Sequence, residues 1–114
     1  MAKFIREFKG NFDEVVEFSK NTVLDNSASS TLEDEVFYNV NDVKIGVLVF
    51  ERYSITGGNR LSLTLTIVGF EDEIKLSAIT SGGSQGIFLK INTLGEQEFL
   101  TEYVGEIVKY IESL

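Results

Sequence analysis

Residues 61–67 read Leu-Ser-Leu-Thr-Leu-Thr-Ile, a strict alternation of apolar and polar side chains. Successive side chains of a β-strand point to opposite faces of the sheet, so this stretch predicts a strand with one buried and one water-facing side. The same period of two continues from residue 31 to about residue 92, interrupted by turn residues. Short turns join neighbouring strands as hairpins, so the pairing should be antiparallel.

Turn residues divide this region into individual strands. A strand that starts near residue 31 should end at Asn41-Asp42, and the next should run from Val43 to about Ile55. A strand of residues 3–9 is expected before the region, and residues 87–91 leave open a last short strand. The other expected interruptions are Thr56-Gly57-Gly58-Asn59, Gly69-Phe70-Glu71-Asp72 and Ser81-Gly82-Gly83-Ser84.

Helical periodicity flanks the strand region on both sides. A helix is expected at about residues 12–25, where Asn11 precedes the first turn and can cap its free amide groups. A second helix is expected after Thr93-Leu94-Gly95-Glu96, which fits a capping box. Its apolar residues recur at i, i+3 and i+4 spacing from Phe99 to Ile111, so this stripe should face the core.

The resulting order is strand, helix, four or five strands, helix. Both helices fit on one face of a curved sheet. We therefore predict a single α+β domain over residues 1–114, a two-layer sandwich of a five- or six-stranded antiparallel sheet with two helices on one face. This layout looks like that of TATA-binding-protein-like and helix-grip domains, a likeness of shape that carries no function.

Composition narrows the possible functions. The 114 residues include no histidine, cysteine, tryptophan or proline, which excludes Ser-His-Asp and Cys-His catalysis and Cys/His zinc sites within one chain. A net charge of −8 disfavours nucleic acid and anionic membranes as partners. The acidic triplets 33–35 and 71–73 lack the spacing of calcium loops, so we expect no metal and no cofactor. With no signal-peptide pattern at its start, a cytoplasmic protein is expected.

Two neighbouring segments are candidates for an anion-binding site. Arginine and tyrosine side chains flank the Gly57-Gly58 turn, and a Gly-rich loop over residues 81–86 could present backbone amides to an anion. The alternatives are a cross-strand ion pair of Arg52 or Arg60 with Glu51 or another exposed acid, and a loop that is only a turn or bulge. The candidate ligand-binding residues are Arg52, Tyr53, Arg60, Ser81, Gly82, Gly83, Ser84 and Gln85.

The strand from Val43 to Phe50 is apolar on both faces. Suppose that the odd-numbered residues of this strand, from Val43 to Val49, face the helices. Leu48 and Phe50 then lie on the second face of the sheet, and Phe37 of the neighbouring strand would share that face. Such a patch would serve as an interface, line a ligand cavity or be shielded by loops. Homodimerisation through Phe37, Leu48 and Phe50 is the most ordinary of these outcomes.

Four segments carry a resemblance to known sequences: Glu51–Ser54, Gly57–Arg60, Ser77–Gln85 and Lys90–Thr93. Together they resemble a family of short bacterial proteins catalogued only as a domain of unknown function. The likeness spans nearly the whole chain and implies a stand-alone cytoplasmic protein of a Gram-positive bacterium. It implies no activity, cofactor or catalytic residue.

The function predicted from the sequence is therefore a non-enzymatic binding or interaction module that forms a homo-oligomer. No catalytic signature is present in the sequence, which favours this class over an enzyme. The alternative is a small anionic-ligand binder or weak enzyme that uses Arg52, Arg60 and the Gly-rich loop 81–86.

Overall fold

A computed structural model describes residues 1–53, 60–82 and 89–114, with side chains of the last segment described from residue 95 on. In these ranges five strands and two helices follow one another in the order β-α-β-β-β-β-α, so the α+β prediction is confirmed. The elements are β1 (Ala2–Lys9), α1 (Phe12–Asn26), β2 (Thr31–Val40), β3 (Val43–Tyr53), β4 (Arg60–Phe70), β5 (Glu73–Gly82) and α2 (Leu89–Glu112).

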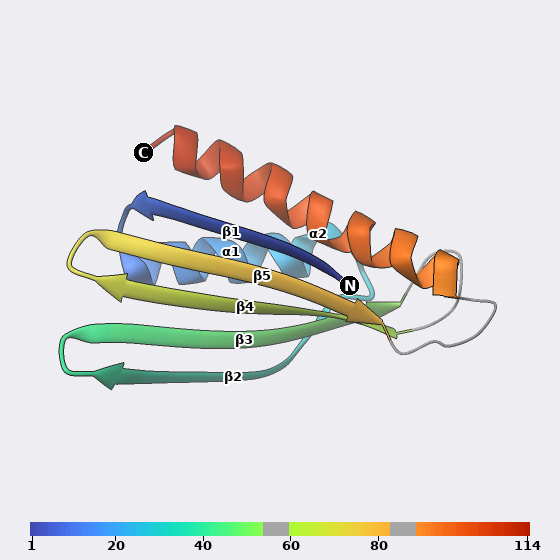
Figure 1. Ribbon diagram of the computed structural model, residues 1–114, viewed down its shortest axis with the longest axis horizontal. Coiled ribbons are helices and arrows are strands. Elements are labelled where there is room, and N and C mark those ends of the chain that lie inside the picture. Colours follow the sequence, from blue (N-terminus) through green and yellow to red (C-terminus); the bar gives the residue numbers. More distant parts are fainter. Residues whose placement is uncertain (54–59, 83–88) are drawn as a thin grey trace.

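The strands form one antiparallel sheet in the order β1-β5-β4-β3-β2 (Figure 1). Strands β2 to β5 are joined in sequence, and β1 pairs with β5, so β1 and β2 lie at opposite edges. Two of the expected turns are present: Asn41 and Glu71 each begin a two-residue connection with a positive φ, 54° and 55°. A positive φ at this position matches the right-handed twist of the strands that the turn joins.

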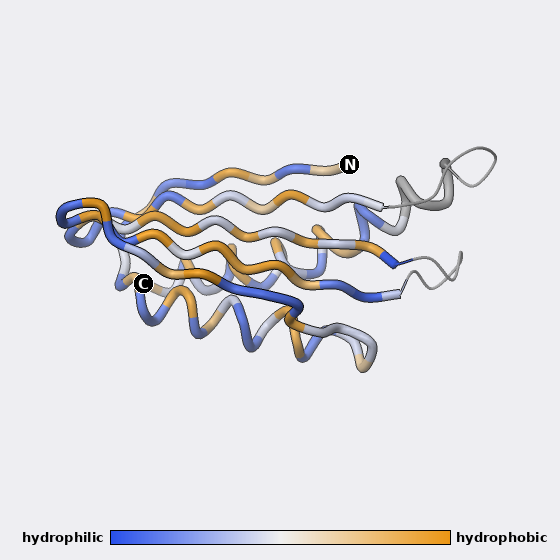
Figure 2. Tube along the Cα trace, turned by 90° about the horizontal axis from the view of Figure 1, so that it is seen from below, coloured by the Kyte–Doolittle hydropathy of each residue, from blue (hydrophilic) through white to orange (hydrophobic). Residues whose placement is uncertain are grey.

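One face of the sheet carries the core. The apolar positions of the 61–67 stretch, Leu61 to Ile67 at odd numbers, are at most 1% exposed, which confirms the alternation predicted for β4. Figure 2 shows this alternation of hydrophobic and hydrophilic residues along the strands. Helix α2 packs on β1, β5 and β4, and α1 packs on β4, β3 and α2. The α2 residues Phe99, Tyr103 and Ile107 are fully buried, as the stripe predicted.

Helix α1 starts where the sequence predicts, whereas α2 starts earlier than predicted. Asn11 caps α1, and its Oδ1 accepts a hydrogen bond from the Glu14 amide at 3.0 Å. Helix α2 already begins at Leu89, so the short strand considered for residues 87–91 is wrong for 89–91, while 87 and 88 lie outside the described residues. The Thr93–Glu96 motif consequently lies inside the helix. No helix in the described ranges is both long and apolar enough to cross a membrane.

Glu96 contacts the sheet and the N-terminal residue and does not act as a helix cap. The Thr80 hydroxyl on β5 donates a hydrogen bond to the Glu96 carbonyl oxygen at 3.1 Å, and Thr80 is fully buried. The Glu96 side chain is only 7% exposed and contacts the amino group of Met1. A capping-box glutamate folds back on the first turn of its own helix, whereas this one is held by β5 and the chain start.

The two faces of β3 are the reverse of the sequence prediction. Leu48 and Phe50 are fully buried beneath the helices, and Leu48 lies opposite Leu65 of β4 on the core face. They therefore cannot form an open patch in this chain, and that part of the interface assignment is wrong. The odd-numbered residues from Val43 to Val49 lie on the other face, which we call the outer face.

Candidate functional site

Arg52 and Arg60 lie on opposite faces of the sheet. In the β3–β4 register, Tyr53 is opposite Arg60 and Arg52 is opposite Leu61, a core residue. Opposed residues of an antiparallel pair share a face, and neighbours along a strand do not. The two guanidinium groups therefore do not converge, and the expectation that both would hold one anion is wrong.

Arg52 is a structural contact between the sheet and α2. Its side chain is 5% exposed, and its Nη1 donates to the Glu102 Oε2 at 2.6 Å. The guanidinium carbon also lies 4.3 Å from the ring centre of Phe99 on the same helix. Carboxylate and aromatic contacts of this kind neutralise the arginine and fix its orientation. The guanidinium of Arg52 is therefore already engaged by Glu102 and Phe99.

Arg60 pairs across strands on the outer face. Its Nη2 is 2.5 Å from the Glu51 Oε1 and 3.5 Å from the Glu33 Oε2, and its guanidinium lies 5.7 Å from the ring centre of Tyr53. This confirms the alternative interpretation of Arg60 as a partner of Glu51. Half-exposed pairs of this type contribute about 1 kcal/mol or less to stability.

The Gly-rich segment is described only at its start. Ser81 and Gly82 are the last residues of β5, and the Ser81 hydroxyl lies 2.7 Å from the Ser62 hydroxyl on β4. Gly83, Ser84, Gln85 and Gly86 lie outside the described residues. An anion cradle at this loop stays a prediction, without Arg52 and Arg60 as joint partners.

Apolar side chains gather on the outer face at the β2 edge of the sheet, a feature that the sequence analysis assigned to the wrong residues. Opposed pairs such as Val36 with Val47 and Tyr38 with Ile45 continue the patch across two strands. Ile45 is in turn opposite Val68 of β4. We define the outer patch as Val36, Tyr38, Val40, Val43, Ile45, Val47, Val49, Val68 and Phe70.

The outer patch is exposed most strongly at its margins. Val36, Tyr38 and Val40 are 50%, 49% and 54% exposed on β2, and Phe70 is 42% exposed at the end of β4. The members on β3 are partly exposed. None of the nine side chains is charged, although the chain carries a net charge of −8. In the described ranges both helices pack on the other face, so no element covers this patch.

The helix side of β2 is also incompletely covered. Phe37 points to that side and is 46% exposed, with its ring across Gly46, where a Cβ atom would lie 2.8 Å from the ring. Glycine is therefore required for the close approach of this ring. A groove of about 440 Å³ runs between α1 and β2 and is lined by Phe12, Val16 and Phe37 with charged residues at its rim. Helix α1 therefore does not fully cover the helix side of β2.

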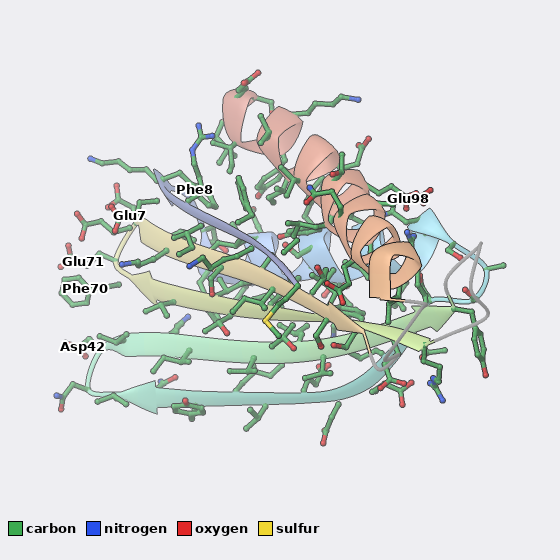
Figure 3. All side chains as sticks on the ribbon, turned by 45° about the vertical axis from the view of Figure 1, so that its right-hand side comes forward. Glu7, Phe8, Asp42, Phe70, Glu71 and Glu98 are labelled. Atoms are coloured by element: carbon green, nitrogen blue, oxygen red, sulfur yellow. The ribbon has the colours of Figure 1, made fainter. Side chains whose placement is uncertain are left out.

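A second hollow, of about 490 Å³, lies at the far end of the sheet. Its walls combine Phe8 and Phe70 with charged side chains, including Glu7 and Lys75, which pair at 3.5 Å. Figure 3 shows Glu7 and Phe8 on β1 at the same end of the molecule as Phe70 and Glu71. Glu7 and Lys75 already pair with each other, so these two side chains are not free to act on a ligand.

The buried hydroxyl groups are structural. The Tyr103 hydroxyl on α2 lies 2.8 Å from the Ser19 hydroxyl on α1, and both residues are fully buried. Burial raises the pKa of Tyr103 well above its usual range, and the hydrogen bond with Ser19 offsets only part of that rise. Tyr103 therefore stays protonated at neutral pH. In the described part of the chain, no group of three acidic residues is arranged to hold a metal ion.

Comparison with known proteins gives a family without a function. Residues 1–111 match the model of a family of unknown function, DUF6054, and the chain belongs to that family. No curated protein and no solved structure matches the chain. The family is consistent with the resemblance found in the sequence, and it assigns no activity. Function must therefore be argued from the surface just described.

Proposed function

We propose that this DUF6054 protein is a non-enzymatic interaction module that works as a homodimer, with a second copy of the chain at the β2 edge, where the outer patch is most exposed. The observation that supports the proposal is the uncovered group of nine uncharged apolar and aromatic side chains at the β2 edge. Contiguous apolar surface of this kind marks interaction sites on soluble proteins.

The size of the outer patch suits a dimer contact. Nine side chains that are partly to half exposed present on the order of 400 Å² of surface, at the level of the largest patch of a typical monomer. A specific interface buries about 800 Å² on each partner, of which roughly 60% is apolar. At the β2 edge the exposed side chains Val36, Tyr38 and Val40, with Phe37 on the helix side, supply apolar area to such a contact, and the neighbouring polar residues supply a rim.

Charge favours a second copy as the occupant. Two chains of charge −8 repel each other, and this repulsion is smallest where the facing surfaces carry no charge. The outer patch meets that condition, whereas the outer face of β1 carries Lys3, Glu7 and Lys9. Because a two-fold contact places the same patch on both partners, an apolar patch is complementary to itself.

A matched pair of charge substitutions tests the homodimer. Val36 and Ile5 lie at opposite ends of one cross-strand row on the outer face, connected through Val47, Thr66 and Ser77. Both are β-branched, and they are 50% and 52% exposed. Val36→Glu places a carboxylate in the contact, and Ile5→Glu places one outside it. Sedimentation velocity over about 1 to 100 µM measures the dissociation constant of each protein.

We expect the parent and Ile5→Glu to form dimers with similar dissociation constants. Val36→Glu should weaken the dimer by about 10-fold or more, because it places two like charges close together in a contact that is otherwise apolar. Circular dichroism checks that both variants are folded. A parent protein that stays monomeric over this range, or equal weakening by both substitutions, would refute the proposal.

A further inference from the structure

We propose that the two copies join edge to edge through β2, which pairs antiparallel with β2 of the second copy about a two-fold axis at Phe37. The two five-stranded sheets then form one continuous ten-stranded sheet. This inference rests on the proposed homodimer and specifies its geometry. It differs from a contact in which the outer faces of two sheets pack against each other.

Exposure on both sides of β2 distinguishes the two geometries. Val36 and Tyr38 are half exposed on the outer face, and Phe37 between them is 46% exposed on the helix side. Face-to-face packing would cover the first two and leave Phe37 in water. Pairing along the edge gives neighbours to side chains on both faces, and it also satisfies backbone groups that an edge strand presents to solvent.

The regular part of β2 sets the register. A shift in the β2–β3 pairing between Leu32 and Asp34 marks a bulge, and the turn at Asn41 ends the strand on the other side. Residues 34–40 therefore form the uninterrupted segment, and Phe37 is its midpoint. Antiparallel pairing about this midpoint uses the whole segment and places the two Phe37 side chains opposite each other on the helix side.

The same register keeps acidic side chains apart. The carboxylates of β2 are gathered at its start, in Glu33, Asp34 and Glu35. With the axis at Phe37, Asp34 lies opposite Val40 of the second copy, and Glu35 lies opposite Asn39. Like charges that face each other across strands destabilise pairing, and this arrangement contains no such pair within residues 34–40.

The other edge of the sheet is a poorer partner for β2. Strand β1 carries Lys3, Arg6, Glu7 and Lys9 along its length and is packed against α2. Charged side chains are a common protection of sheet edges. In addition, β1 pairing with β2 of another copy would be head-to-tail and would leave free edges for further growth. Pairing of β2 with β2 closes at two copies.

Single-cysteine cross-linking tests the geometry, because the chain has no cysteine of its own. Directly opposed residues of antiparallel strands have Cα atoms about 4.5–5.5 Å apart, within the range of a disulfide. Phe37→Cys should therefore oxidise to a covalent dimer across the axis. Val36→Cys is the control for register, because Val36 faces Tyr38 of the second copy and lies about 8 Å from its own counterpart.

Val47→Cys is the control for face-to-face packing, since Val47 lies in the middle of the outer patch on β3. We expect mild oxidation to convert most Phe37→Cys protein to a dimer on a non-reducing gel. Val36→Cys and Val47→Cys should cross-link at least about tenfold more slowly. Sedimentation of the reduced variants confirms that each still forms the non-covalent dimer.

The outcomes separate the two proposals. A dimeric parent in which Val47→Cys cross-links and Phe37→Cys does not would overturn edge pairing and leave the homodimer standing. Faster cross-linking of Val36→Cys than of Phe37→Cys would overturn the register. A parent that assembles beyond two copies contradicts closure through β2, and a strictly monomeric parent refutes the homodimer itself.

Discussion

The two edges of the sheet are built differently. The outer face of strand β1 carries three charged residues, Lys3, Glu7 and Lys9, and one apolar residue, Ile5. Helix α2 packs on the other face of this strand. Strand β2 contains no lysine, arginine or proline and exposes apolar side chains on both faces. Natural proteins protect sheet edges with charges or cover. The acidic residues of β2 lie at its start, and residues 36–40 carry no charged side chain, so this is the edge that we expect a second copy to cover.

The position of α1 explains why β2 is left open. The buried hydrogen bond between Ser19 and Tyr103 joins α1 to α2, and α1 lies over β3 and β4. One ion pair does reach the edge, from Lys20 on α1 to Glu35 on β2 at 2.9 Å. An ion pair at this partly exposed position does not replace apolar packing. The two helices therefore cover one edge and stop short of the other.

The largest expected effect separates the covered part of the sheet from the open part. Leu76→Ala removes a fully buried side chain of β5 beneath the helix layer, and should lower the free energy of unfolding by about 2–5 kcal/mol. Val47→Ala, on the outer face of β3, should cost the monomer about 1 kcal/mol. Urea unfolding at a concentration below the dimer dissociation constant measures both. Similar losses would contradict the assignment of the two faces.

A second prediction concerns the attachment of α2 to the sheet. Glu102→Ala leaves the guanidinium of Arg52 buried without its carboxylate, and should cost about 2–3 kcal/mol of unfolding free energy. This is less than for a fully buried pair, because the Glu102 side chain is 36% exposed. Arg52→Met keeps the apolar volume and lets Glu102 turn to water, so it should cost about 1 kcal/mol or less. The reverse order would show that Arg52 is hydrated.

The link between the helices gives a smaller effect. Tyr103→Phe leaves the buried Ser19 hydroxyl without its partner, and should lower the free energy of unfolding at pH 7 by about 1–2 kcal/mol. The double variant Tyr103→Phe with Ser19→Ala should recover part of this loss, because both polar groups are then removed. Urea unfolding of the two single variants and the double variant measures the coupling. Strict additivity would contradict a hydrogen bond.

The same tyrosine predicts a loss of stability at high pH. Burial raises the pKa of Tyr103 above the 10.0 of a free tyrosine, so above that pH the unfolded chain releases a proton that the folded chain retains. Stability is therefore full below about pH 10 and falls by up to about 1.4 kcal/mol per pH unit above it. Burial and the nearby Glu14 also raise the pKa of Tyr110, which adds in the same direction. Tyr103→Phe should flatten the profile.

The architecture could be predicted from the sequence because strands and helices repeat their apolar residues with different periods. The alternation from Leu61 to Ile67 identified a strand with one buried face, and the spacing of Phe99, Tyr103 and Ile107 identified the inner face of α2. Both signals arise from burial on a single side. The start of α2 was placed too late because Thr93–Glu96 fits a capping box, whereas these residues lie inside the helix and Glu96 contacts Thr80 and Met1.

The site was less predictable because β3 is apolar on both faces. Periodicity alone cannot decide which face turns to the helices when Val47 and Leu48 are equally suited to a core. Partner strands settle it, since Leu48 lies opposite Leu65, whereas Val47 lies opposite Thr66. The placement of the two arginines on opposite faces could have been predicted. Six residues connect β3 to β4, and with an even number of connecting residues Tyr53 shares a face with Arg60, so its neighbour Arg52 lies on the other face.

The most direct test of the central claim is amide hydrogen exchange of the parent protein at two concentrations, one above and one below the dimer dissociation constant. With a second copy on the β2 edge, protection of residues 34–40 should fall on dilution, while protection of β1 stays unchanged. Protection of 34–40 that is the same at both concentrations, in a protein that sedimentation shows to be dimeric at the higher one, would contradict it.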